Sequence, residues 1–170
     1  MRVVLVLAVL LAGEAEAVER AADVLALRLV DAGGHEATVG DVLGDRPAVV
    51  SAWATYCAPC RAEAPALARA AHRWRGARVV AVMTDVGEGR ELARVRDDWQ
   101  IEVELRGVAS GQAAELDALL PAGLPATFFV RDGGVTRVDR FLSEEELARL
   151  IDEHLGICTA PRPADERGGL

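Results

Sequence analysis

The chain has 170 residues, a length that suggests one domain with short tails. Hydrophobic residues make up 51% of it and charged residues 27%, which provides a core but is too polar for a bundle of membrane helices. The formal net charge is -8 and all 19 basic residues are arginine. Because no basic stripe is available to neutralise phosphates, the sequence argues against a nucleic-acid partner.

The N-terminus has the pattern of a secretory signal. Met1-Arg2 gives a basic start, residues 3–12 are an unbroken apolar run, and Ala15-Glu16-Ala17 offers small residues at the positions that a signal peptidase reads. We expect residues 1–17 to be a signal peptide cleaved after Ala17, and the protein to be exported to the periplasm or another extracytoplasmic compartment. The alternative for this apolar run is a buried β-strand.

The following segments alternate between strand and helix patterns. We expect an edge strand at 24–30, a turn at 31–35, a short helical turn at 38–43, and further strands at 48–53, 78–83, 102–108, 127–130 and 135–139. Helices are expected at 61–74, 90–99, 111–120 and 143–155, the last beginning with a capping box of Ser143 and Glu146. This order predicts an α/β fold in which helices cover both faces of a central mixed β-sheet.

The expected domain spans residues 18–158, and residues 159–170 are polar enough, with two prolines and two glycines, to predict a disordered tail. Three cysteines are present, of which Cys57 and Cys60 form a C-x-x-C pair. Cys158 follows the last expected helix, and we expect it to be dispensable.

The C-x-x-C pair follows an expected buried strand and opens an expected helix. A thiolate at a helix N-terminus is stabilised by free N–H groups and by the helix dipole, so Cys57 is the expected nucleophile. Cys60 lies about one turn inside the same helix, where it can resolve a mixed disulfide. Two alternatives stay open: a purely structural disulfide, and a zinc site completed by His154 and Cys158.

The segment from Trp53 to Arg61, W-x-x-x-C-x-P-C-R, resembles the active-site segment of the thioredoxin superfamily. Pro65 matches the proline that bends the active-site helix in that family, and residues 123–128 resemble the segment that carries its cis-proline. The resemblance covers roughly residues 24–155. It implies a thioredoxin fold in which Pro125 is cis and faces Cys57.

More narrowly, the chain resembles the TlpA-like group of exported thiol–disulfide oxidoreductases. The helix start from Cys60 to Pro65 resembles its C-R-x-E-x-P motif, and residues 27–34 resemble its leading hairpin. An additional stretch around 90–107 lengthens the path from Cys60 to Pro125. The resemblance therefore implies an N-terminal strand extension and a central insertion. Two departures are Tyr56, where a Trp is usual, and Ser51, where thioredoxin carries a buried Asp.

This resemblance implies a thiol–disulfide oxidoreductase that acts on exported proteins and is recharged by a membrane electron-transfer protein, without a cofactor or a metal. The reducing direction is predicted from the residues themselves, because Ala58-Pro59 offers no side-chain donor and Glu63 would repel a nearby thiolate. The candidate catalytic residues are Cys57, Cys60 and Glu63, and the candidate substrate-binding residues are Trp53, Tyr56, Leu124 and Pro125.

Two of these side chains have a second interpretation. Glu63 lies one helical turn after Cys60, either as the proton acceptor of the resolving thiol or as a solvated acid. Trp53 either contacts substrate or packs in the core. Two alternative functions are a non-catalytic scaffold module and a peroxiredoxin-like peroxidase, for which Thr55 would be the threonine upstream of the reactive Cys57.

Overall fold

The computed structural model describes residues 21–157. The predicted signal peptide, the predicted tail and Cys158 lie outside these residues. No helix in the described range is long and apolar enough to cross a membrane.

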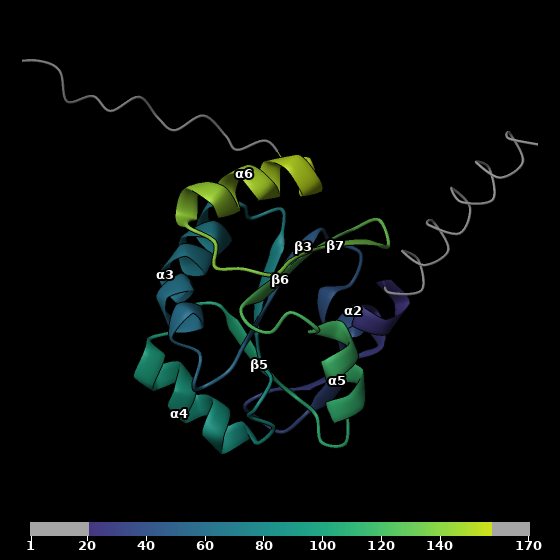
Figure 1. The fold of residues 1–170 in the computed structure, drawn as a ribbon, viewed down its shortest axis with the longest axis vertical. Helices are drawn as coiled ribbons and strands as arrows, with labels where there is room; N and C mark the ends of the chain where they lie inside the picture. Colours follow the sequence, from purple (N-terminus) through teal and green to yellow (C-terminus); the bar gives the residue numbers. More distant parts are fainter. Residues whose placement is uncertain (1–20, 158–170) are drawn as a thin grey trace, which may run out of the picture.

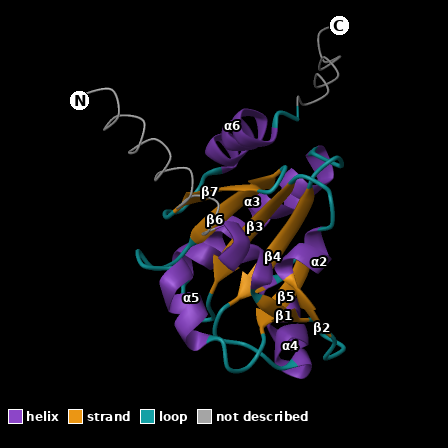
Figure 2. Ribbon diagram, turned by 90° about the vertical axis from the view of Figure 1, so that its right-hand side faces the viewer, coloured by secondary structure: helices purple, strands orange, loops and turns teal. Residues whose placement is uncertain are grey.

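Seven strands form one sheet in the order β2-β1-β5-β4-β3-β6-β7 (Figure 2). Strands β3, β4 and β5 are parallel, and the others pair antiparallel, so the mixed sheet predicted from the sequence is confirmed. The strands are β1 (Arg28–Val30), β2 (Glu36–Thr38), β3 (Ala48–Trp53), β4 (Arg78–Met83), β5 (Glu104–Val108), β6 (Ala126–Arg131) and β7 (Gly134–Val138).

Helices cover both faces of this sheet (Figure 1). One hydrophobic core lies under α3 (Ala58–Arg73), α4 (Gly89–Trp99) and α6 (Glu144–Leu155). A second core on the opposite face lies under α2 (Val39–Leu43) and α5 (Ala113–Leu119). The predicted capping box of Ser143 and Glu146 is present at the start of α6.

Strand β3 occupies the centre of the fold, between β4 and β6. All six of its residues are buried, and Val49 and Val50 belong to the two opposite cores. A strand buried on both faces is expected to be predominantly apolar, and five of the six residues of β3 are, the exception being Ser51. Its carboxyl end leads directly into the Cys57 loop and α3.

The predicted edge strand at residues 24–30 is wrong in part. Residues 21–26 are helical, β1 begins only at Arg28, and β2 rather than β1 forms the edge of the sheet. The buried side chains of Ala21, Val24 and Leu27 recur every three residues, which is a helical spacing. Helix α3 also begins three residues earlier than predicted, because Cys57 is its N-cap.

A close backbone approach restricts β5 at Gly107. A Cβ atom here would overlap the carbonyl oxygen of Val86, in the loop that follows β4. Because backbone has little freedom to move aside, we expect Gly107→Ala to lower the free energy of unfolding by about 1–3 kcal/mol, measured by urea denaturation. Gly76→Ala is the control, since its Cβ would lie an ordinary 3.8 Å from Ile157 Cγ2. Equal losses in the two variants would contradict this prediction.

Candidate active site

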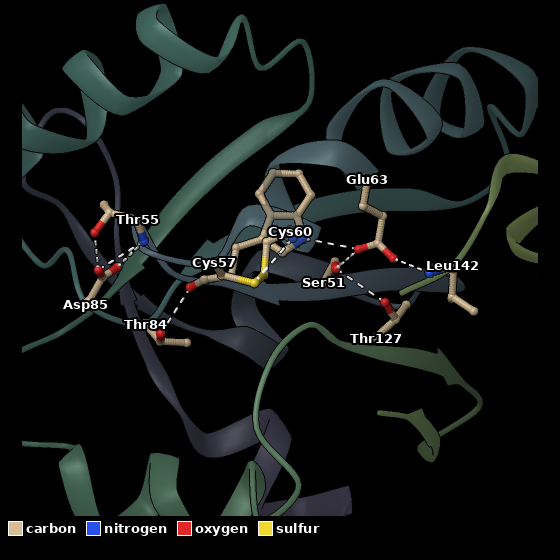
Figure 3. Close-up of a disulfide and its surroundings, with 10 residues drawn as sticks. Ser51, Thr55, Cys57, Cys60, Glu63, Thr84, Asp85, Thr127 and Leu142 are labelled. Carbon is tan, nitrogen blue, oxygen red and sulfur yellow. Dashed lines mark hydrogen bonds between the residues drawn. A yellow bond between two sulfur atoms is a disulfide. The ribbon is translucent and has the colours of Figure 1, made fainter. Parts of the chain in front are cut away.

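Cys57 and Cys60 form a disulfide at the N-terminus of α3, with their Cα atoms 5.3 Å apart (Figure 3). Cys57 is the N-cap residue, and its Sγ accepts a hydrogen bond of 3.2 Å from the Cys60 backbone N–H. Cys60 has no exposed surface, whereas Cys57 keeps 7%. The sulfur of Cys57 is therefore both the more accessible one and the one that the helix N-terminus would stabilise as a thiolate.

The chain before Cys57 is fixed by residues at the end of the neighbouring parallel strand, β4. Thr84 donates from its backbone N–H, at 2.8 Å, and from its hydroxyl, at 3.0 Å, to the Trp53 carbonyl oxygen. The Asp85 carboxylate accepts hydrogen bonds from the Thr55 backbone N–H, at 3.0 and 3.1 Å, and from the Thr55 hydroxyl. These contacts attach the loop that presents Cys57 to the loop that follows β4.

Glu63 lies on the other side of the disulfide from Asp85 in the view of Figure 3. It has no exposed surface, so the interpretation as a solvated acid is wrong. Its Oε2 accepts hydrogen bonds from Ser51 Oγ at 3.0 Å and Trp53 Nε1 at 3.2 Å, and its Oε1 accepts one from the Leu142 N–H at 2.9 Å. Ser51 Oγ also lies 3.2 Å from Thr127 Oγ1, so strands β3 and β6 both contribute to this polar cluster.

Burial raises the pKa of Glu63 above its usual value of 4.5, because desolvation disfavours the charged carboxylate. The hydrogen bonds from Leu142, Trp53 and Ser51 act in the opposite direction and do not cancel this effect. A carboxyl group with a raised pKa can exchange a proton closer to neutral pH than an exposed glutamate can.

Trp53 has no exposed surface, so it is a core residue in this structure rather than a surface for substrate. Its indole donates to Glu63 and lies 6.1 Å, between ring centroids, from Trp99 at the end of α4. The Arg61 guanidinium stacks 5.8 Å over the same Trp99 ring and donates to the Asp98 carbonyl oxygen at 3.2 Å. The predicted insertion, which contains α4, is thus packed directly against the active-site helix.

The Leu124–Pro125 peptide bond is cis, as predicted. Pro125 immediately precedes β6, and Ala126 of β6 pairs with Ala52 of β3. The proline therefore lies beside the carboxyl end of β3, where the Cys57 loop begins.

A groove of about 600 Å³ opens at this point, and we call it the α5 groove. Tyr56 and Leu124 line its end near the disulfide, and its walls are the loop after β4, the β5–α5 connection and α5 itself. Tyr56 is 80% exposed and Leu124 is partly buried. Of the four predicted substrate-binding residues, these two therefore line an accessible surface and Trp53 does not.

Asp85 and Thr127 are site residues that the sequence analysis missed. Asp85 had a detectable signal, because a helix is predicted between the strands at 48–53 and 78–83, which is typical of parallel strands, and the carboxyl ends of parallel strands lie at one edge of a sheet. Thr127 had no such signal in the sequence. Its contact with Ser51, 76 residues away, depends on the register of β3 and β6.

A family model described as the AhpC/TSA family matches residues 18–138. The chain belongs to the AhpC/TSA family. Among solved structures, dsbF of Mycobacterium tuberculosis is 22% identical with a TM-score of 0.63, and the match covers 77% of this chain and 96% of that one. A secreted disulfide oxidoreductase of the same organism, homologous to E. coli DsbE, is 22% identical with a TM-score of 0.62 over 79% and 98% of the chains.

A third solved structure is a thiol:disulfide interchange protein of the thioredoxin family from Chlorobium tepidum. It is 19% identical to this chain, with a TM-score of 0.60 over 75% of this chain and 91% of that one. These likenesses confirm the thioredoxin fold. No curated protein matches the chain.

The raised pKa of Glu63 gives a testable pH dependence of stability. In the oxidised protein no active-site thiol titrates, and the contribution of Glu63 is greatest below pH 4.5 and is lost as the pH rises through its folded-state pKa. We therefore expect the stability of Glu63→Gln relative to the wild type to improve as the pH rises from 4.5 through the folded-state pKa of Glu63, by about 1.4 kcal/mol for each unit of pKa shift. Urea denaturation of the oxidised proteins at several pH values measures it.

Glu146→Gln is the control of opposite sign. Hydrogen bonds from the Ser143 backbone and from Arg140 lower the pKa of Glu146, so its contribution is present above pH 4.5 and is lost in acid. The free energy of unfolding of the wild type should therefore increase relative to that of Glu146→Gln as the pH rises. A stability difference between Glu63→Gln and the wild type that does not change with pH would show that the Glu63 pKa is not raised.

Proposed function

We propose that this protein is a thiol–disulfide oxidoreductase that reduces disulfides in exported proteins through Cys57 and Cys60. The observation that carries the proposal is the disulfide at the N-terminus of α3, with Cys57 the less buried of the two cysteines and a buried carboxyl group one helical turn beyond Cys60. A structural disulfide or a scaffold module does not require an acid buried at this position.

In the proposed reaction the Cys57 thiolate attacks one sulfur of a substrate disulfide. A mixed disulfide forms and the first substrate thiolate leaves. The Cys60 thiol then loses its proton and attacks the Cys57 sulfur, which forms the Cys57–Cys60 disulfide and releases the second substrate thiolate. Two electrons pass from the dithiol to the substrate, so an external reductant has to restore the dithiol.

Glu63 is the proposed acceptor of the Cys60 proton. The two residues are three positions apart on α3, and both are fully buried, so water is poorly placed to take this proton. The raised pKa of Glu63 brings its proton affinity closer to that of a thiol than an exposed glutamate would have. Trp53, Ser51 and Leu142 hold the carboxylate in place through their hydrogen bonds.

The reducing direction is supported by what surrounds the dithiol. Strong oxidants stabilise the thiolate of the first cysteine and thereby favour the reduced form. Between the cysteines of this chain stand Ala58 and Pro59, which offer no side-chain donor, and the Glu63 carboxylate would repel a thiolate nearby. Cys57 Sγ accepts one hydrogen bond, from Cys60.

Export, substrate and reductant belong to the same proposal. The N-terminal pattern supports cleavage near Ala17, and two of the similar solved structures are a secreted oxidoreductase and an exposed lipoprotein thioredoxin. The TlpA-like resemblance supports disulfide-bearing exported proteins as substrates and a membrane electron-transfer protein as reductant. Tyr56 and Leu124, which line the α5 groove, would contact an extended substrate segment there. Pro125 is buried and does not line the groove, and its proposed part in binding is to adjoin Leu124 beside the substrate segment.

A peroxiredoxin-like peroxidase is the second candidate, because the chain belongs to the AhpC/TSA family and Thr55 precedes Cys57 by two positions. The Thr55 hydroxyl, however, donates to Asp85. Peroxide consumption by the reduced protein separates the two functions: a reductase leaves hydrogen peroxide largely unconsumed over the time in which it reduces a disulfide substrate.

The roles of the two cysteines are tested by trapping. We expect Cys60→Ser to accumulate mixed disulfides on Cys57 with exported proteins, because the resolving thiol is missing, whereas Cys57→Ser should trap none. Non-reducing electrophoresis and mass spectrometry identify the adducts. Alkylation of the reduced variants is the control, since the rapidly reacting thiol should disappear in Cys57→Ser only. Trapping by Cys57→Ser alone would reverse the assignment.

The reducing direction is tested by the equilibrium potential against glutathione. We expect a value near that of thioredoxin, about -270 mV, and far from that of DsbA, about -120 mV. Glu63→Gln should lower the pKa of an active-site thiol, because a repelling charge is lost, or should slow exchange, as measured by alkylation against pH. A potential above about -180 mV would overturn the reducing direction. An unchanged pH profile and exchange rate would remove Glu63 from the mechanism.

A further inference from the structure

The α5 groove, where a substrate would lie, carries only negatively charged side chains among its charged lining residues. Its charged lining residues are Asp85 and Asp117, and no Arg or His from residues 21–157 lines it. The remaining lining is apolar or neutral and includes Val108, Leu116 and Leu120. A groove that combines apolar side chains with two carboxylates fits a peptide that combines apolar and basic side chains.

The two acids occupy different walls of the groove. Asp85 follows β4 and is oriented by the Thr55 backbone and hydroxyl, so its carboxylate is held beside the Cys57 loop. Asp117 lies on α5 and is exposed. Neither carboxylate forms an ion pair with another residue of the range 21–157, so both charges are available to a ligand.

We infer that the α5 groove selects disulfide substrates that carry basic residues beside the target cysteine, and that it disfavours acidic ones. This inference rests on the proposed reductase function and adds the substrate class to it. Like charges brought together at a binding surface oppose association, and opposite charges favour it and accelerate encounter. The net charge of -8 acts in the same direction at longer range.

The test uses three disulfide-bridged peptides that are identical except for two residues flanking one cysteine, which are Arg, Gln or Glu. Rates of reduction by the reduced protein should fall in the order Arg, Gln, Glu. Because exposed charge pairs are weak, each step should be about two- to five-fold at low salt. The ratio should approach one in about 1 M salt, where the Debye length is about 3 Å.

A matched pair of variants places the effect in the groove. Asp117→Asn should lower the ratio of the Arg-peptide rate to the Glu-peptide rate at low salt. Glu115→Gln removes the same charge from the same helix at a position that does not line the groove, and it should leave that ratio unchanged. Asp85→Asn should also lower the ratio, with a thermal melt of the variant to exclude unfolding, since Asp85 also holds Thr55.

Three other outcomes would overturn the charge selection or its assignment to the groove. Equal rates for the three peptides overturn the charge selection and leave the reductase function intact. A ratio lowered equally by Asp117→Asn and Glu115→Gln assigns the effect to the net charge and overturns the groove as its source. Reduction of none of the peptides overturns the proposed function and the charge selection together.

Discussion

Glu63 is a carboxyl group with no exposed surface, and three other parts of the fold supply its surroundings. Burying such a group is unfavourable unless it is hydrogen-bonded. Here β3 provides the Ser51 hydroxyl and the Trp53 indole, the segment before α6 provides the Leu142 N–H, and β6 adds Thr127 through Ser51. The acid thereby links α3 to the two central strands and to the segment before the last helix, one helical turn after Cys60.

The dithiol is subject to two opposing electrostatic influences because of this placement. The N-terminus of α3 favours a thiolate at Cys57, and the Cys60 N–H already points at that sulfur. The buried carboxyl group of Glu63 acts against a thiolate, and Ala58 and Pro59 offer no side-chain donor that would stabilise one. In the proposed reductase, such a balance would leave the dithiol ready to donate its electrons to a substrate disulfide.

The same parallel strands that position the dithiol also shape the surface beside it. Because β3 and β4 run in the same direction, the loop that carries Cys57 and the loop that carries Asp85 leave the sheet at one edge. Helix α4 lies beside this edge, since its Trp99 ring packs against Trp53 and the Arg61 guanidinium lies over the same ring. The central insertion thus supports the active-site helix from one side and leaves the α5 groove open on the other.

The sequence by itself determined the features that depend on near neighbours: the C-x-x-C pair between a buried strand and a helix, the capping box at Ser143, and the order of elements that identifies the fold class. These are spacings of a few residues, and the chain encodes them directly. The burial of Glu63 and the contact of Asp85 with Thr55 depend instead on the tertiary structure. A helical position such as that of Glu63 fixes its neighbours along the helix but not which face the sheet covers. Contacts such as those of Glu63 with Leu142, 79 residues apart, depend on strand register and helix docking, which arise from the packing of the whole chain.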